Sequence, residues 1–170
     1  EDRPDDVGVP ENTIAAYENG IPTAVTSVEL ALRTTKDSVL VIMHDATVDR
    51  MTNGRGKISD LTYAEVRKLK VTDKRKDSMK TYAVPAFKEV LQACKNKINI
   101  YLDFKDASVQ QSYDLIKKYG MEKHVIVYIN SPLQYEEWRR LVPSMPVMLS
   151  LPDTIKDGKT LKCPARSGIL

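Results

Sequence analysis

The sequence predicts an α/β fold with a parallel sheet, in the form of an incomplete (β/α)8 barrel. Strand-like and helix-like segments alternate with short connections, which is typical of parallel βαβ units. A doubly wound sheet fits this alternation as well. Polar side chains at the ends of the strands favour the barrel, because barrel enzymes carry their functional residues there. The expected strands cover residues 25–33, 39–43, 98–105, 124–129 and 146–151.

Length and composition indicate one domain, over residues 1–170, with a sizeable hydrophobic core. The chain has 170 residues, of which 42% are hydrophobic. Its 26 basic and 23 acidic side chains are well mixed, so the net charge of +3 gives no argument for binding nucleic acid. No run of about 18 apolar residues occurs, and we therefore expect no transmembrane segment.

Two strands joined by a tight polar turn form the centre of the sequence. In the first strand Glu29, Ala31 and Arg33 share one face, and the apolar residues between them share the other. The second strand, residues 39–43, is apolar throughout, so we expect it to be covered on both faces. It ends on His44, which indicates chemistry rather than packing alone.

Capping residues and helical periodicity place helices between the other strands. Thr62 and Glu65 have the spacing of a capping box, which begins a helix that we expect to end near Leu69. Cys94 has helical spacing with apolar residues and is interpreted as a core residue, whereas Cys163 lies in an irregular tail, so the two form no disulfide framework. The expected helices cover residues 14–19, 62–69, 86–95, 108–119 and 131–141.

Four polar side chains, those of Glu29, His44, Asp103 and Lys105, fall at predicted strand ends. The two carboxylates would hold a hard divalent cation through oxygen, and the cation and Lys105 would neutralise charge on a phosphate. His44 could pass a proton to or from an alcohol oxygen near neutral pH. The same residue types also occur as satisfied structural groups, and spacing alone leaves both interpretations open. His124 begins a strand at the opposite end and is interpreted as structural.

Seven short motifs follow one another between residues 10 and 105, within a region of similarity that covers residues 1–151. They are Pro10–Thr13, Val28–Leu30, Thr35–Asp37, His44–Asp45, Asp49–Gly56, Val84–Leu91 and Ile100–Lys105. The run from His44 to Gly56 is the most specific of them. Together these motifs resemble the glycerophosphodiester phosphodiesterase family.

The resemblance implies a PLC-like phosphodiesterase of the TIM-barrel type, which hydrolyses a small-molecule glycerophosphodiester to an alcohol and sn-glycerol 3-phosphate. It implies a bound divalent metal, Ca²⁺ or Mg²⁺, with Glu29 and Asp103 as metal ligands, although the family usually has glutamate at the second position. By the same similarity His44 is one of a pair of acid/base histidines and Lys105 contacts the phosphate. The attacking group in the family is thought to be the glycerol hydroxyl of the substrate, through a cyclic phosphate.

The sequence departs from the family pattern in three places. Family members carry Glu-x-Asp on the first of these strands, but here the last position is Ala31. Where the family has His-Arg-Gly, this chain has Asp2-Arg3-Pro4. Either Asp2 replaces the first catalytic histidine and Arg3 meets the phosphate, or the chain begins after the true motif. A complete barrel needs about 250 residues, and the first strand and the last two strands have no counterpart here.

We therefore expect a domain that is truncated at both ends, or a degenerate copy, with impaired activity. The alternative is a non-catalytic barrel that binds a phosphorylated ligand or partner. The resemblance favours a periplasmic or secreted parent protein over a cytoplasmic one. Neither the alcohol part of the substrate nor the oligomeric state follows from the sequence.

Overall fold

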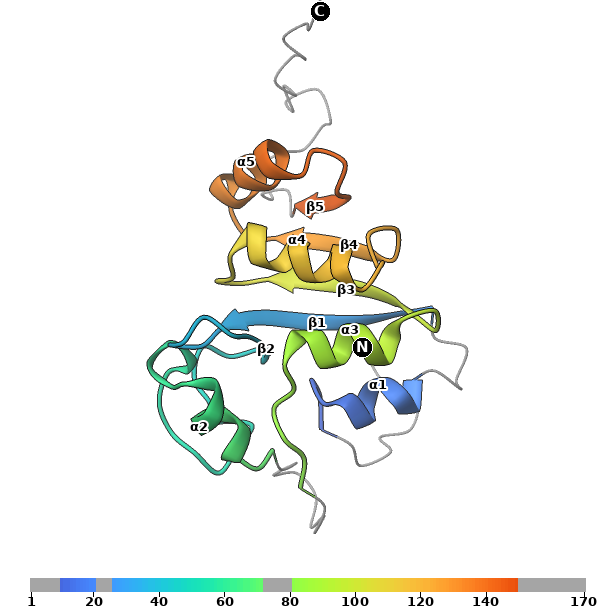
Figure 1. Cartoon of the computed structure of the whole chain (residues 1–170). Helices are drawn as coiled ribbons and strands as arrows, with labels where there is room; N and C mark the ends of the chain where they lie inside the picture. The colour runs from blue at the N-terminus through green and yellow to red at the C-terminus, as the bar shows by residue number, and fades with distance from the viewer. Residues whose placement is uncertain (1–9, 21–25, 72–80, 150–170) are drawn as a thin grey trace, which may run out of the picture.

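A computed structural model of the chain describes residues 10–20, 26–71 and 81–149. These residues form one five-stranded sheet, in the order β2-β1-β3-β4-β5 (Figure 1). All five expected strands are found, with shifts of one or two residues at their described ends. Residue 25 of the first expected strand and residues 150 and 151 of the last lie outside the described residues. The strands are β1 (Ser27–Thr34), β2 (Leu40–Ile42), β3 (Asn99–Phe104), β4 (Val125–Ile129) and β5 (Val147–Leu149).

Four of the strands are parallel, and the fifth runs against them. β1 pairs in parallel with β3, β3 with β4 and β4 with β5, as the alternation of strands and helices predicts. β2 pairs with β1 antiparallel, with Leu32 opposite Ile42 and Thr34 opposite Leu40. The reason is the tight turn between them: the Thr35 amide donates to the Val39 carbonyl at 3.0 Å, which closes a hairpin. β2 is therefore not a barrel strand of its own.

Helices cover one face of the parallel strands and bury its apolar residues. The core between them includes Leu30, Leu102 and Val127 from the sheet, and Phe87 and Trp138 from the helices. In Figure 1, α3 and α4 lie across the sheet, with α1 beside α3 and α5 beside β5. The helices of the described residues are α1 (Ile14–Gly20), α2 (Tyr63–Lys68), α3 (Phe87–Cys94), α4 (Val109–Lys118) and α5 (Pro132–Leu141), with a 3₁₀ turn at Ile58–Asp60.

A second, smaller core lies between the hairpin and α2. Val41 and Met43 pack here, whereas Leu40 and Ile42 pack in the main core, so β2 is covered on both faces as expected. α2 begins at the predicted capping box, in which Thr62 accepts from the Glu65 amide and the Glu65 carboxylate accepts from the Thr62 amide. Cys94 is fully buried in the main core, which confirms its interpretation. None of the described helices combines the length and apolar composition needed to span a membrane.

Candidate functional site

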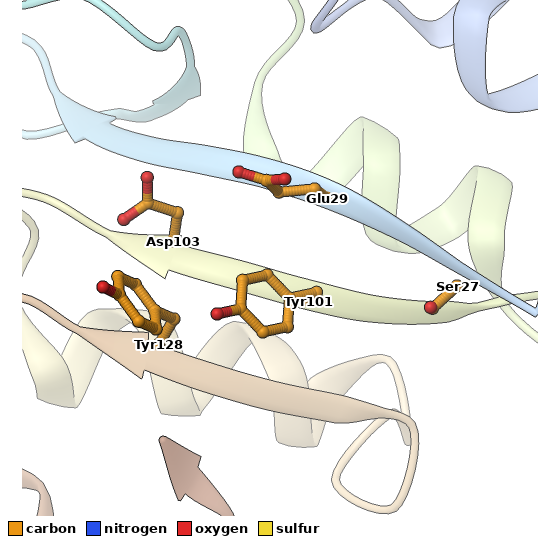
Figure 2. A pocket seen from close by; sticks show the side chains of 5 residues that line it. All are labelled: Ser27, Glu29, Tyr101, Asp103 and Tyr128. Carbon is orange, nitrogen blue, oxygen red and sulfur yellow. The ribbon is translucent and has the colours of Figure 1, made fainter. Parts of the chain in front are cut away.

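The face of the sheet opposite the helices carries polar and aromatic side chains. Strand periodicity sends alternate residues to this face, and Figure 2 shows them projecting from β1, β3 and β4 with the helices behind. They surround an open cleft of about 680 Å³. Its lining residues are Ser27, Glu29, Tyr101, Asp103 and Tyr128. The structure therefore brings the predicted residues Glu29 and Asp103 to one cleft.

Asp103 is the most enclosed charged group of the cleft, with only 5% of its surface exposed. The Lys105 ammonium Nζ lies 2.6 Å from Asp103 Oδ2. Asn130 Nδ2 donates to the other carboxylate oxygen, Oδ1, at 2.9 Å. Both oxygens are thus engaged, and the Lys105 charge is held at the carboxyl end of β3 (Figure 2 shows the Asp103 carboxylate).

Asn130 and Gln134 are functional candidates that the sequence analysis missed. The Asn130 amide side chain also donates to the Phe104 carbonyl at 2.9 Å, and Gln134 Nε2 donates to the Lys105 carbonyl at 2.8 Å. The Asn130 backbone amide donates to Gln134 Oε1 at 2.7 Å, which joins the two. Asn130 directly follows β4, so the rule that barrel strands end in functional residues could have identified it.

Two tyrosines form an aromatic wall of the cleft. The rings of Tyr101 and Tyr128 are stacked, with centroids 5.7 Å apart (Figure 2). Burial, and then the neighbouring Tyr128, raise the pKa of Tyr101, so its phenol keeps its proton near neutral pH. Tyr128 was not recognised from the sequence, because a tyrosine inside an apolar strand looks like any other core residue.

Glu29 lies deeper along the sheet than the sequence predicts. It is the third residue of β1 and pairs in register with Tyr101, not with Asp103. The expectation that it lies at the end of the strand is wrong, because β1 continues to Thr34 before the hairpin turn. Glu29 is exposed to the cleft, and within the described ranges its carboxylate has no hydrogen-bond partner.

The structure does not bring the predicted residue His44 into the lining of the cleft. Because β2 is antiparallel, its carboxyl end returns toward the middle of β1, where the Met43 amide donates to the Ala31 carbonyl at 2.9 Å. The prediction that His44 ends a strand of the barrel is therefore wrong. Its side chain is 53% exposed and is not among the residues that line the cleft. Arg33, on the same sheet face as Glu29, donates to the His44 carbonyl from Nε at 3.0 Å and Nη2 at 2.8 Å.

A chain of charged groups leads from the His44 ring through Asp45 and Arg50 to Glu11. His44 Nδ1 lies 3.0 Å from Asp45 Oδ1. Arg50 donates to both oxygens of Asp45, from Nε at 2.6 Å and Nη2 at 3.0 Å, and its Nη2 also meets Glu11 Oε1 at 2.7 Å. Hydrogen bonds from Arg50 are the main cause that lowers the pKa of Asp45 to about 2, and the two carboxylates raise the pKa of Arg50. Asp45 is therefore a carboxylate at any ordinary pH.

The described residues supply only part of a calcium or magnesium site. Ca²⁺ takes about six to eight oxygen ligands, and Mg²⁺ takes about six, of which one or two are carboxylates and several are waters. No group of three His, Cys, Asp or Glu side chains in the described part of the chain is arranged to hold a metal ion. Ala31, which is 2% exposed and pairs in register with Asp103, offers no oxygen, and both Asp103 oxygens already have partners.

Two further predicted positions have simple outcomes. Arg3 lies outside the described residues. His124 lies immediately before β4, at the end of the sheet away from Asp103, where its Nδ1 is 3.0 Å from Asn99 Oδ1. This contact agrees with its interpretation as a structural residue.

Comparison with known proteins identifies the family. The model of the "Glycerophosphoryl diester phosphodiesterase family" matches residues 4–147. A glycerophosphodiester phosphodiesterase of Caldanaerobacter subterraneus subsp. tengcongensis is 30% identical over 154 residues, which cover 86% of this chain and 63% of the relative. The chain thus spans less than two thirds of the length of this curated relative.

Solved structures show the same fold. A glycerophosphodiester phosphodiesterase of Agrobacterium tumefaciens superposes with a TM-score of 0.76 at 23% identity, over 84% of this chain and 62% of that one. An Oleispira antarctica phosphodiesterase, solved in complex with the product sn-glycerol-3-phosphate, gives a TM-score of 0.72 at 18% identity, over 85% and 61%. These likenesses confirm the expected fold, an incomplete TIM barrel. With the family model matching residues 4–147, this chain belongs to the glycerophosphoryl diester phosphodiesterase family.

Proposed function

We propose that the protein hydrolyses glycerophosphodiesters to an alcohol and sn-glycerol 3-phosphate. The observation that carries this proposal is the match of one family model to residues 4–147, which include the polar cleft. The Oleispira antarctica phosphodiesterase, which shares the fold, was solved with sn-glycerol-3-phosphate as its product. We also propose a periplasmic or secreted location, which rests on the family resemblance alone.

The proposed roles follow from the chemistry of each side chain. Hydrolysis of a phosphodiester adds the elements of water across one P–O bond, so a group must give a proton to the departing alcohol oxygen. His44, exposed beside the cleft face, is the proposed proton-transfer residue. Lys105, held by Asp103, is the proposed cation for the phosphate oxygens. Arg3 remains a proposed phosphate contact on the resemblance alone.

The metal requirement is proposed in a weaker form than the resemblance implies. Glu29 and Asp103 are the proposed ligands from this chain, and Ca²⁺ or Mg²⁺ would supply positive charge at the phosphate. Since Ala31 has no carboxylate and Asp103 is engaged by Lys105 and Asn130, the described residues hold such an ion poorly. We therefore propose impaired activity. A single missing proton-transfer group is worth roughly 10²–10⁴-fold in rate.

A second candidate function is binding without turnover. The incomplete set of metal ligands favours this function. Because Ala31 has no carboxylate and Asp103 is paired with Lys105, the described residues leave a polar cleft that has a cation but few metal ligands. Such a cleft would bind a phosphorylated ligand or partner through charge alone.

One experiment separates the two functions. Purified chain is mixed with glycerophosphocholine and Ca²⁺ or Mg²⁺, and both the thermal midpoint and the release of glycerol 3-phosphate are measured. Hydrolysis predicts metal-dependent release that is lost in His44→Ala and kept in His124→Ala, the matched control. A raised thermal midpoint without release would instead support binding. If neither signal is seen with any metal, both functions are refuted for this chain.

A further inference from the structure

We infer that Asp45 is a positioning residue for His44, which fixes the proton of the imidazole on Nδ1 and leaves Nε2 as the nitrogen that exchanges a proton with substrate. This inference rests on the proposed function, because it assigns a task to His44. Its geometry, however, stands independently of catalysis. Asp45 is charged, adjacent in sequence and in contact with the ring.

The His44 ring is in direct contact with the Asp45 carboxylate. His44 Nδ1 lies 3.0 Å from Asp45 Oδ1. An ionised carboxylate has no proton to donate and only accepts hydrogen bonds. Nδ1 must therefore carry the hydrogen, in the neutral ring as well as in the imidazolium. In the neutral ring the lone pair is then on Nε2, which is the form that a general base needs at that atom.

Arg50 fixes the orientation of the Asp45 carboxylate and keeps it ionised. Arg50 approaches it as a fork, with Nε 2.6 Å from Oδ2 and Nη2 3.0 Å from Oδ1. Such bidentate pairs fix the orientation of a carboxylate as well as its charge. Glu11, before α1, accepts a hydrogen bond from the same Nη2 of Arg50 at 2.7 Å. The lowered pKa of Asp45, about 2, agrees with this arrangement.

A second arginine, Arg33, fixes the backbone of His44. Arg33 donates twice to the His44 carbonyl, and its Nη1 lies 2.7 Å from Asp106 Oδ2 in the segment that follows β3. Only 13% of the Arg33 side chain is exposed. The backbone and the ring of His44 are thus held by separate charged groups, Arg33 with Asp106 and Asp45 with Arg50. A loop residue that only packs against the surface would need neither.

His124 provides an internal comparison. It is the other histidine of the chain, and its Nδ1 lies 3.0 Å from the amide oxygen of Asn99. No carboxylate lies against its ring among the interactions of the described residues. An effect that is specific to Asp45 must therefore change the position of the ring proton in His44 and leave that in His124 unchanged.

The test uses the full chain labelled with ¹⁵N. Two-bond ¹H–¹⁵N correlation spectra report which ring nitrogen of each histidine carries the proton. We expect the Nδ1–H form for neutral His44 in the wild type. In Asp45→Asn the side-chain amide can donate to Nδ1, so the Nε2–H form should become the major one. Arg50→Met should shift the balance in the same direction but less, and Arg50→Lys less still.

The controls make the result specific. Arg67→Met removes an arginine that pairs with Glu89 at 3.1 Å outside the site, and it should leave the His44 signals unchanged. His124 should keep its tautomer in every variant. If Asp45→Asn does not fold, Asp45→Ala, which also removes the carboxylate, decides the question. A wild-type His44 that is mainly Nε2–H, or a tautomer balance that neither variant moves, would overturn the inference.

Activity gives a second, separate readout. Asp45→Asn should lower kcat by about tenfold to a hundredfold with little change in KM, since the full effect of acid–base catalysis is roughly 10²–10⁴-fold. Arg50→Lys should retain more activity than Arg50→Met. A wild type without any release of glycerol 3-phosphate would refute the proposed function, while the tautomer spectra would still decide the role of Asp45. A rise in KM as large as the fall in kcat would contradict a positioning role for Asp45.

Discussion

At the scale of single residues, position 31 determines how many carboxylates face the cleft. Ala31 lies on β1 directly beside Asp103 of β3, because the two residues pair in register in neighbouring parallel strands. Residues paired in this way point to the same face of the sheet. The position that carries aspartate in the family pattern is therefore correctly placed here, and only its carboxylate is missing.

Restoring this carboxylate should make the thermal midpoint depend on the concentration of a divalent cation. In Ala31→Asp, a second negative charge would lie beside Asp103, and like charges facing each other across strands destabilise a sheet by up to about 1 kcal/mol. A divalent cation between them would remove that repulsion. We expect the thermal midpoint of the variant to rise with added Ca²⁺ or Mg²⁺ more than that of the wild type.

The matched control for this prediction is Ala31→Asn, which has nearly the same volume but no charge. Its thermal midpoint should show no greater dependence on metal than the wild type. Equal metal responses of the aspartate and asparagine variants would mean that residue 31 does not contribute to a metal site.

The individual site residues could be predicted from the sequence only in part. Alternation along the strands was sufficient to place Glu29, Asp103 and Lys105 on one face, because the side-chain period of a strand is fixed. The partners of Asp103 could not be predicted in the same way. Asn130 meets Asp103 across 27 positions of the sequence, and such a pair depends on strand order rather than on local pattern.

At the scale of elements, ion pairs attach the segment after β2 to its neighbours. Arg50 joins this segment to Glu11 just before α1, and Arg33 joins it to Asp106 after β3. The hairpin pairing, the packing of Met43 and Val48 in the smaller core and these charged contacts together define where His44 lies. The direction of β2 was mispredicted as that of a parallel strand, because an apolar run of residues does not reveal which way it pairs.

This attachment should be sensitive to acid. The pKa of Asp45 is about 2 in the folded chain, against about 3.9 in an unfolded one. Between these values the unfolded state binds more protons, so the stabilisation is complete above about pH 4 and is lost as the pH falls toward 2. In Arg50→Met the pKa of Asp45 should return to about 3.9. The free energy of unfolding should then be lower at pH 5 and should fall less steeply below pH 4 than in the wild type.

Urea unfolding at a series of pH values measures this difference. Asp37 and Glu65 also have lowered pKa values, so the comparison between variant and wild type, not the wild-type slope alone, isolates Asp45. In Asp45→Asn the free energy of unfolding should fall with decreasing pH as weakly as in Arg50→Met. In Arg67→Met it should fall as steeply as in the wild type. A steep acid slope retained in Arg50→Met would contradict the role of this ion pair.

At the scale of the whole molecule, the sheet is a section of a barrel with helices outside and a polar face inside. Ile126 and Met148, which are exposed, lie with Tyr128 on the strands of this section. The sequence could predict the class of fold and the identity of the strands, because alternation, capping residues and turns are local signals. The closure of a barrel is not local, and the chain spans less than two thirds of the relative compared above.

The most direct test of the proposed hydrolysis is to determine whether this chain converts glycerophosphocholine to glycerol 3-phosphate. We would follow glycerophosphocholine by ³¹P NMR in the presence of Ca²⁺ or Mg²⁺, with wild-type chain and with His44→Ala. The account predicts a growing glycerol 3-phosphate signal in the wild type, and its loss in the variant. A phosphocholine signal, or release that persists without His44, would contradict it.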